Sequence, residues 1–563
     1  MRRHALAIVA GIALSGAAHA AVELRTLGGP DDPLRAECER CAEGDYFLDN
    51  GALEIAVGAS HRRDESFYRF ATADAYGSIV FCRPRGSTAR GDAMLGTPYL
   101  RIGNTTHHLV YEEVRVDDVG VGHPTPRARI RASVERELGG GARVRFEVRY
   151  EIEDASPRIG VRLRATNVGS RTLDGLIYAL FFDPHQIYDF SPADHAAHRA
   201  LAFRGYPRAS HLLAWIDPTP RVAASEDRYG WDGGMLLPDP VSIRLEPGAS
   251  DERHYALVAG SDSATVLARA YRELAVTSHR VMLEPESASR DFYEVAIREA
   301  GSQSIFYRAF RDRPEPLAIE LPAGAYVARA NFFPGVDECS FTVPSAGGRA
   351  CALRDPPLGR ARFRIVDGAG RFVPGKLSFH GIEETRSPYF RPVNPAYDDG
   401  YWESYKNSVY PERGGSEVAL PVGRYRVVAS RGPEYAIDER IVEIDAERVE
   451  DLALRIERAI DRSDLISMDS HLHTLESDGS VDIAAKVRAI VAEGVEVAIA
   501  TDHNFPVDYR PALAALGLEG ELIAFTGAEV TVPERLDYNT YPMQLCTEPP
   551  IATCPRLGGA GAG

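Results

Sequence analysis

Short strands of alternating polarity run from Leu24 to about Glu457 and constrain the fold of this chain more than any other feature. Between residues 144 and 165, apolar residues alternate with Arg and Glu on both sides of an Asp-Ala-Ser-Pro turn. Such alternation predicts an antiparallel hairpin with one buried face. Similar runs, separated by Gly, Pro and Asp clusters, continue to about residue 275 without a convincing long amphipathic helix. We therefore predict a β-sandwich region over residues 21–275.

An internal repeat predicts two smaller β-modules. The segment Leu-Pro-Ala-Gly-Ala-Tyr326 recurs as Leu-Pro-Val-Gly-Arg-Tyr425. A Pro-x-Gly turn before a strand with an inward Tyr is typical of small Ig-like or carboxypeptidase-regulatory-like sandwiches. We place the modules at residues 276–350 and 359–457. An aromatic insertion at 389–410 has two open interpretations, a binding surface or a face that packs against the next domain.

The N-terminus has the pattern of a secretory signal peptide over residues 1–20. Arg2 and Arg3 precede an apolar run, and Ala18-His19-Ala20 forms a small-x-small cleavage site. No later stretch reaches about 18 apolar residues, so we expect no membrane span and a periplasmic or secreted protein. A formal net charge of −17 argues against a nucleic-acid partner.

The chain has seven cysteines, an odd number for an exported protein. The pair Cys38 and Cys41 has the spacing of half a zinc site, but no second pair lies at zinc spacing. A local disulfide or unpaired thiols are the simpler interpretation.

After Asp461 the pattern changes to alternating strands and helices, which predicts parallel βα units over residues 464–563. A helix is expected to begin at a Ser480 cap and to end at Gly494. The other expected elements are the strands Leu465–Met468, Val497–Ala500 and Leu522–Phe525 and the short helix Pro511–Leu516.

Polar side chains follow each of these three strands. His471 and His473 come after the first, Asp502 and His503 after the second, and Glu529 after the third. The carboxyl ends of parallel strands meet at one mouth, which Asp478 in the next turn can also reach. Imidazoles with carboxylates suit zinc, manganese or iron, so the cluster predicts a metal site.

A second group of histidines lies upstream, at His185, His195 and His198. These residues stand in a Pro- and Asp-rich stretch without a strand-end pattern. We interpret this group as part of a surface loop.

The motifs Met468–Thr474, Ser477–Gly479, Thr501–Asn504 and Gly527–Thr531 together resemble the first motifs of the PHP (polymerase and histidinol phosphatase) metallohydrolases. The Thr-Asp-His-Asn form and the upstream β-modules resemble the carbaryl-hydrolase-like CehA/McbA branch. The segment Arg431–Tyr435 also resembles the module that precedes the metal domain there. The resemblance implies that residues 464–563 form the first part of a distorted (βα) barrel.

The resemblance also implies roles for single residues. His471 and His473 would hold one divalent ion, and Glu529 would bridge it to a second. Asp478 and His503 would serve a further metal position, whereas Asp469 and Asp502 would support the ligands from behind. Two or three ions of zinc, manganese or iron are implied for a complete domain.

The implied activity is hydrolysis of a small-molecule ester by a metal-activated water. The PHP class favours phosphoesters, whereas the branch adds carbamates and carboxylic esters, and the residues do not separate these. The alternative is a secreted, non-catalytic β-sandwich scaffold or binding protein with a degenerate C-terminal domain. A closed βα barrel needs roughly 200 residues, so we expect an incomplete barrel here and weak or no hydrolase activity of this chain. Asp537 also stands where the branch often has a histidine.

Overall fold

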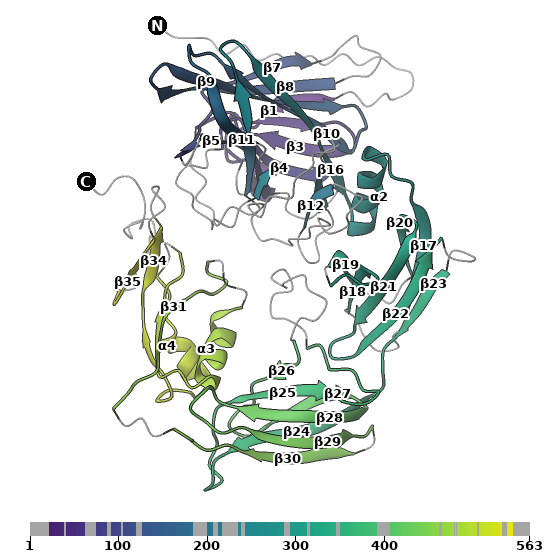
Figure 1. Cartoon of the computed structure of the whole chain (residues 1–563), viewed down its shortest axis with the longest axis vertical. Helices are drawn as coiled ribbons and strands as arrows, with labels where there is room; N and C mark the ends of the chain where they lie inside the picture. The colour runs from purple at the N-terminus through teal and green to yellow at the C-terminus, as the bar shows by residue number, and fades with distance from the viewer. Residues whose placement is uncertain are drawn as a thin grey trace.

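The computed structural model gives the fold of this chain between residues 22 and 543. It describes these residues apart from 39–40, 62–74, 87–91, 103–104, 120–126, 184–199, 206–211, 217–234, 238–241, 287–292, 304, 312–315, 345–348, 391–405, 447, 461–463, 478, 480, 504–505 and 532–536. The chain is a mostly-β, multidomain protein whose four parts follow one another along a curved path (Figure 1). No helix in the described part is long and apolar enough to span a membrane.

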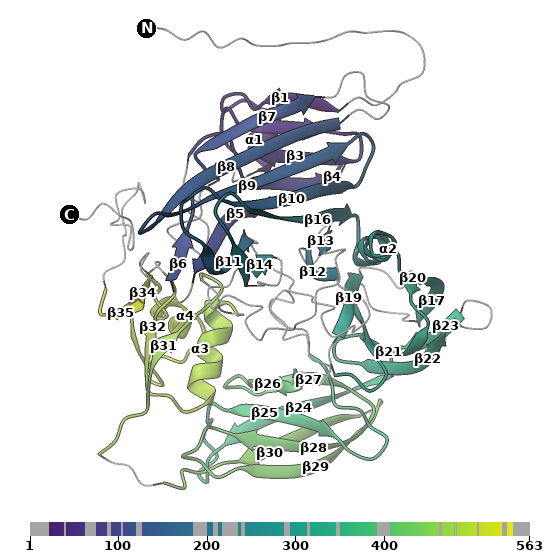
Figure 2. The same cartoon turned by 45° about the horizontal axis from the view of Figure 1, so that its top comes forward.

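The first part is a sandwich of two antiparallel sheets (Figure 2). One sheet has the order β1-β2-β3-β4-β5-β11-β14, with β6 paired to β5 and β15 to β11. Its strands are β1 (Glu23–Thr26), β2 (Tyr46–Asp49), β3 (Leu53–Val57), β4 (Ile79–Pro84), β5 (Asp92–Ile102), β6 (Thr105–His108), β11 (Leu173–Asp183), β14 (Met235–Leu237) and β15 (Ile243–Leu245). A short helix, α1 (Pro33–Glu37), follows β1.

The other sheet has the order β12-β13-β16-β10-β9-β8-β7. Its strands are β7 (Glu113–Val119), β8 (Arg127–Gly139), β9 (Ala142–Glu153), β10 (Arg158–Asn167), β12 (Ala200–Gly205), β13 (Leu212–Ile216) and β16 (Ser250–Gly260). The predicted hairpin at 144–165 is confirmed as β9 and β10, with Ile152 opposite Ile159. Its apolar residues are buried against the first sheet, where the rings of Phe146 and Tyr178 pack edge to face at 5.9 Å.

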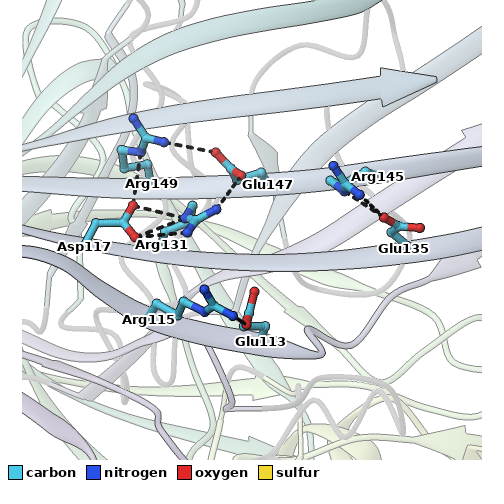
Figure 3. Close-up of polar contacts among 8 residues, drawn as sticks. All are labelled: Glu113, Arg115, Asp117, Arg131, Glu135, Arg145, Glu147 and Arg149. Atoms are coloured by element: carbon cyan, nitrogen blue, oxygen red, sulfur yellow. Dashed lines mark hydrogen bonds and ion pairs between the residues drawn. The ribbon is translucent and has the colours of Figure 1, made fainter. Parts of the chain in front are cut away.

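The polar face of this second sheet carries a ladder of arginines and carboxylates (Figure 3). Arg131 lies directly opposite Arg149 across the β8–β9 pair, an arrangement that is repulsive by itself. Asp117 and Glu147 each contact both guanidinium groups at distances from 3.0 to 3.9 Å, which offsets the repulsion. Because exposed ion pairs contribute little each, the ladder marks a solvated face.

Helix α2 (Ser263–Glu273) joins the sandwich to the first module, and it was not expected from the sequence. Asp262 caps it by accepting a hydrogen bond from the backbone N–H of Thr265 at 2.8 Å. Its apolar residues recur at helical spacing as one stripe, with Arg269 and Arg272 on the opposite face, so the helical period is present in the sequence. The buried residues of that stripe join the core of the module that follows; they are Val266, Leu267, Ala270 and Tyr271.

The two modules share one topology of seven strands, as the sequence repeat predicts. In the first, sheets β20-β17-β23 and β19-β18-β21-β22 face each other; in the second, β27-β24-β30 and β26-β25-β28-β29 do so. The first has β17 (His279–Glu286), β18 (Tyr293–Glu299), β19 (Ile305–Arg311), β20 (Leu317–Leu321), β21 (Gly324–Asn331), β22 (Val336–Val343) and β23 (Arg349–Arg354). The second has β24 (Leu358–Val366), β25 (Lys376–Gly381), β26 (Ser408–Val409), β27 (Ser416–Pro421), β28 (Gly423–Ser430), β29 (Asp438–Ile444) and β30 (Val449–Arg455).

The repeated tyrosines occupy equivalent places in the two modules. Tyr326 in β21 and Tyr425 in β28 are both buried. Their hydroxyls donate to the carbonyls of Pro322 at 3.0 Å and Pro421 at 2.8 Å. In each module the tyrosine hydroxyl therefore stabilises the turn that precedes its own strand.

The cysteines in the described part are mostly paired. Cys38 bonds to Cys41, which confirms the local disulfide and removes both thiolates as zinc ligands. Cys339 on β22 bonds to Cys351 on β23. Cys82 is a buried free thiol, and burial raises its pKa to about 12.

The last part begins with three parallel strands in the order β31-β32-β33. Its elements are β31 (Met468–Leu472), α3 (Ile483–Ala492), β32 (Val497–Ala500), α4 (Arg510–Ala515), β33 (Ile523–Phe525), β34 (Ala528–Thr531) and β35 (Asp537–Thr540). Two expected details are wrong. The first strand begins at Met468 rather than Leu465, and the cap of α3 is Asp482, which accepts from the N–H of Ala485. Ser480 lies outside the described residues.

The described residues form no barrel. Helices α3 and α4 cover one face of the three-stranded sheet, and β34 pairs with β35 as a separate hairpin. The alternation along β33 shows the open face: Ala524 packs toward the helices, whereas Ile523 and Phe525 are exposed. Within the described ranges, this part is therefore an open α/β sheet whose second side exposes apolar residues.

The second module docks on this α/β part through Arg431 and Gly432. Arg431 is buried and donates to the carbonyl of Pro374 at 3.2 Å and to Glu521 at 3.1 Å. A Cβ on Gly432 would lie 2.0 Å from the carbonyl oxygen of Glu493, and its φ of +64° also favours glycine. These contacts explain the segment Arg431–Tyr435 as an interdomain clamp.

Candidate metal centre

Two strand ends and one hairpin bring the predicted ligands together. His471 lies near the end of β31, and His473 is the first residue after it. His503 follows β32, and Glu529 lies in β34. His503 and Glu529 form an isolated β-bridge, and the N–H of Glu529 donates to the carbonyl of Asp502 at 3.2 Å. The hairpin is thereby held against the end of β32.

Three imidazoles converge on one oxygen of Glu529. Its Oε2 lies 3.0 Å from Nε2 of His471, 3.2 Å from Nε2 of His473 and 3.6 Å from Nε2 of His503. The rings of His473 and His503 are 4.9 Å apart between centroids. Glu529 is buried, whereas the side chain of His471 is half exposed. The cluster therefore lies at a surface mouth with a buried carboxylate at its base.

These distances fit a divalent metal site. Zinc ligands lie about 2.0–2.1 Å from the ion, so at tetrahedral angles neighbouring ligand atoms are about 3.3 Å apart. The separations from Glu529 fall around this value. One ligating atom each from His471, His473 and Glu529 lie within 4.8 Å of one another. The donor set of imidazole nitrogen and carboxylate oxygen also suits manganese or iron.

Asp502 organises the turn that carries His473. Its fully buried carboxylate accepts from the N–H and the hydroxyl of Thr474 at 2.7 and 3.0 Å and from the hydroxyl of Ser477 at 2.7 Å. Ser477 Oγ also lies 3.2 Å from Nδ1 of His473. This contact orients the imidazole so that Nε2 faces Glu529, the support that metal-binding histidines usually have.

Backbone contacts fix the remaining motif residues. The carboxylate of Asp469 accepts from the N–H of His471 at 3.1 Å. Thr501 exchanges hydrogen bonds with the backbone of Leu472, which ties the end of β31 to that of β32. Gly479 is required because a Cβ there would lie 2.5 Å from the carbonyl of His473. In the sequence, Thr474 and Thr501 are only members of the motifs. These hydrogen bonds show their structural roles.

Four of the five predicted ligands therefore meet at one point. Asp478, the fifth, lies outside the described residues, as do His185, His195 and His198. Asp537 lies opposite Thr531 in the β34–β35 hairpin, whereas Glu529 pairs with Asn539.

Tyr509, the residue before α4, lies near the metal cluster, which the sequence motifs do not predict. Its ring is buried in the core beneath the strand ends, and its hydroxyl has no hydrogen-bond partner among the described residues. Burial and the negative charges of Asp502 and Asp469 raise the pKa of Tyr509 well above its usual range. Tyr509 stands between Asp508 and Arg510 in the sequence, so its local surroundings give no indication of such a position.

No family model matches this chain, and no curated protein matches it. Several solved structures resemble it at low identity. A polysaccharide lyase is 12% identical with a TM-score of 0.24, over 52% of this chain and 46% of the lyase. A galactosidase domain of an alpha-galactosidase-sucrose kinase is 7% identical with a TM-score of 0.25, over 44% and 46% of the two chains. A streptococcal ancillary pilin is 13% identical with a TM-score of 0.17, over 45% and 80%. The chain spans about half the length of the first two.

Proposed function

We propose that this protein is an exported, metal-dependent hydrolase of ester-type bonds, which acts on phosphoesters or on carbamate or carboxylic esters. The observation that carries the proposal is the convergence of His471, His473 and His503 on one oxygen of Glu529. Surface histidines without a common ligand are not expected to contact the same buried carboxylate oxygen. The resemblance to the first motifs of the PHP metallohydrolases supports the same function.

His471, His473 and Glu529 would hold the ion, and His503 would complete or extend its ligand set. When bound, a divalent ion supplies Lewis acidity and activates water as a nucleophile at neutral pH. The chain's own residues orient this site. Asp502 fixes the turn that carries His473, and the half-exposed His471 leaves the mouth open to a small ester.

The test is metal content followed by turnover. The purified mature protein should contain zinc, manganese or iron by elemental analysis, and its turnover of an aryl phosphate and aryl ester panel should be metal-dependent but weak, because the described residues form no barrel around the site. Glu529→Gln should lose at least one metal equivalent, because three imidazoles lose their shared carboxylate. Glu519→Gln, an exposed glutamate in the same part, is the matched control and should keep its metal. A wild-type protein without metal and without turnover would support the non-catalytic scaffold instead.

A further inference from the structure

A cavity of about 260 Å³ lies between the second module and the α/β part. Phe372 and Tyr410 line it from the module, and Val491 and Leu516 line it from α3 and the end of α4. The last turn of α3 precedes β32, so this cavity lies toward the amino ends of the parallel strands. The metal cluster lies at the carboxyl ends, and the two sites are separate.

The walls of the cavity combine apolar and polar surface in nearly equal parts. Two aromatic rings and two prolines, Pro374 and Pro411, come from the module, while aliphatic side chains come from the helices. Pockets that bind small molecules commonly lie at domain interfaces and combine such walls with a few polar groups. Here the aromatic, proline and aliphatic side chains suit a compact planar body.

Two guanidinium groups supply the polar part. Arg413 stacks over Phe372 at 5.3 Å, and its one hydrogen bond within the described residues, to the carbonyl of Gly517, is 3.5 Å long. Among the residues that the structure describes, Arg488 has one ion pair, with the exposed Glu412, also at 3.5 Å. Both distances are at the outer limit of a polar contact, so each guanidinium keeps most of its donor capacity. Two arginines against one carboxylate leave the cavity with an excess of positive charge.

The two sides of the cavity are held at a set spacing. The Arg431 clamp crosses the same interface, and Lys376 forms an ion pair with Glu493 beside it. A ligand therefore meets walls that are already in place, which reduces the ordering cost of binding.

We propose that this interdomain cavity binds a small anion with a flat apolar body, of which an aryl carboxylate is the simplest case. The ring lies between Phe372 and the aliphatic wall, and the carboxylate accepts hydrogen bonds from Arg413 and Arg488. Guanidinium groups match planar carboxylates in geometry and charge. The site is independent of the metal centre.

The experiment is calorimetric titration of the full-length protein with benzoate, in the presence of chelator so that the metal cluster takes no part. Benzyl alcohol and benzamidine are matched neutral and cationic probes. We expect saturable benzoate binding with a dissociation constant of about 10 mM or tighter for a ligand of this size. Binding of benzyl alcohol should be at least tenfold weaker, and benzamidine should not bind.

Variants locate the site. Arg413→Gln with Arg488→Gln should weaken benzoate binding at least tenfold, whereas Arg510→Gln, an exposed arginine on α4, should not change it. Leu516→Trp fills the cavity while both arginines remain, and it should also abolish binding. Absence of saturable binding by the wild type, equal binding of the three probes, or benzoate binding that survives Leu516→Trp would each overturn the proposal.

Discussion

The hydroxyl of Ser477 donates to the buried carboxylate of Asp502 at 2.7 Å, and the Oγ of Ser477 also lies 3.2 Å from Nδ1 of His473. A residue after the second strand thereby controls an imidazole after the first. The metal cluster depends on this buried aspartate as much as on the side chains that face the mouth.

Asp502→Ala should therefore weaken both stability and metal binding. It leaves the donors of Thr474 and Ser477 without their acceptor, and each unpaired buried donor costs about 1–3 kcal/mol. We expect the α/β part to lose about 2–4 kcal/mol by hydrogen exchange, and metal affinity to fall about 10- to 100-fold. Asp508→Ala, which removes an ion pair with the exposed Arg510, is the control. Equal effects of the two changes would contradict the assigned role.

Two buried tyrosines should respond in opposite ways to loss of the hydroxyl. Tyr425→Phe removes the bond to Pro421 and leaves that carbonyl without this donor, so we expect a loss of about 1 kcal/mol. Tyr509→Phe removes a hydroxyl without a partner among the described residues, so stability of the metal-free protein should stay equal or rise slightly. Urea unfolding followed by circular dichroism measures both. A clear loss for Tyr509→Phe would show that its hydroxyl has a partner.

The β-rich parts over residues 22–455 should fold without metal. Their two sandwich types bury their own apolar faces, and their cores lie apart from the histidine cluster. Chelator should leave the far-ultraviolet β-sheet spectrum unchanged and should increase hydrogen exchange only around residues 468–531. A cooperative loss of β-structure when chelator is added would contradict this prediction.

The clamp at Arg431 should contribute to the stability of the interface. Arg431→Ala removes the bonds to Pro374 and Glu521, so the buried carbonyl of Pro374 loses this donor. We expect the unfolding free energy of the α/β part to fall by about 1–3 kcal/mol, with faster hydrogen exchange in α3. Arg440→Ala, which removes an exposed ion pair on the same module, should cost less than about 1 kcal/mol.

Asp32 should make the N-terminal sandwich sensitive to acid. Its hydrogen bond with Arg25, helped by the N–H groups of Gly28 and Leu34, lowers the pKa of Asp32 from 3.8 to about 2. Because the folded pKa is the lower one, the carboxylate stabilises the fold above about pH 4, and this contribution is lost as the pH falls toward 2. Melting temperatures from pH 5 to pH 2 should therefore fall less for Asp32→Asn than for wild type. Asp31→Asn changes an exposed neighbouring carboxylate, and it should leave the pH dependence of the melting temperature as in wild type.

Local periodicity and motif spacing were enough to predict much of this protein. The alternation at 144–165 predicts β9 and β10 because a half-buried strand has a period of two. The repeated Pro-x-Gly-x-Tyr segment predicts two equal modules, and the strand-end positions of His471, Asp502 and Glu529 predict that they meet. Each of these inferences needs only the geometry of one element or of neighbouring parallel strands.

Only the tertiary structure decided the rest, because the contacts concerned join residues distant in sequence. Nothing near Tyr509 in the sequence indicates that its hydroxyl lies buried beneath the metal cluster, and nothing near Arg413 indicates that it faces Arg488 across a cavity. Helix α2 is stable because a separate module covers its apolar stripe. The sequence by itself determines which faces are apolar and which chemical groups are available, whereas packing between domains decides which of those faces are covered and which groups meet.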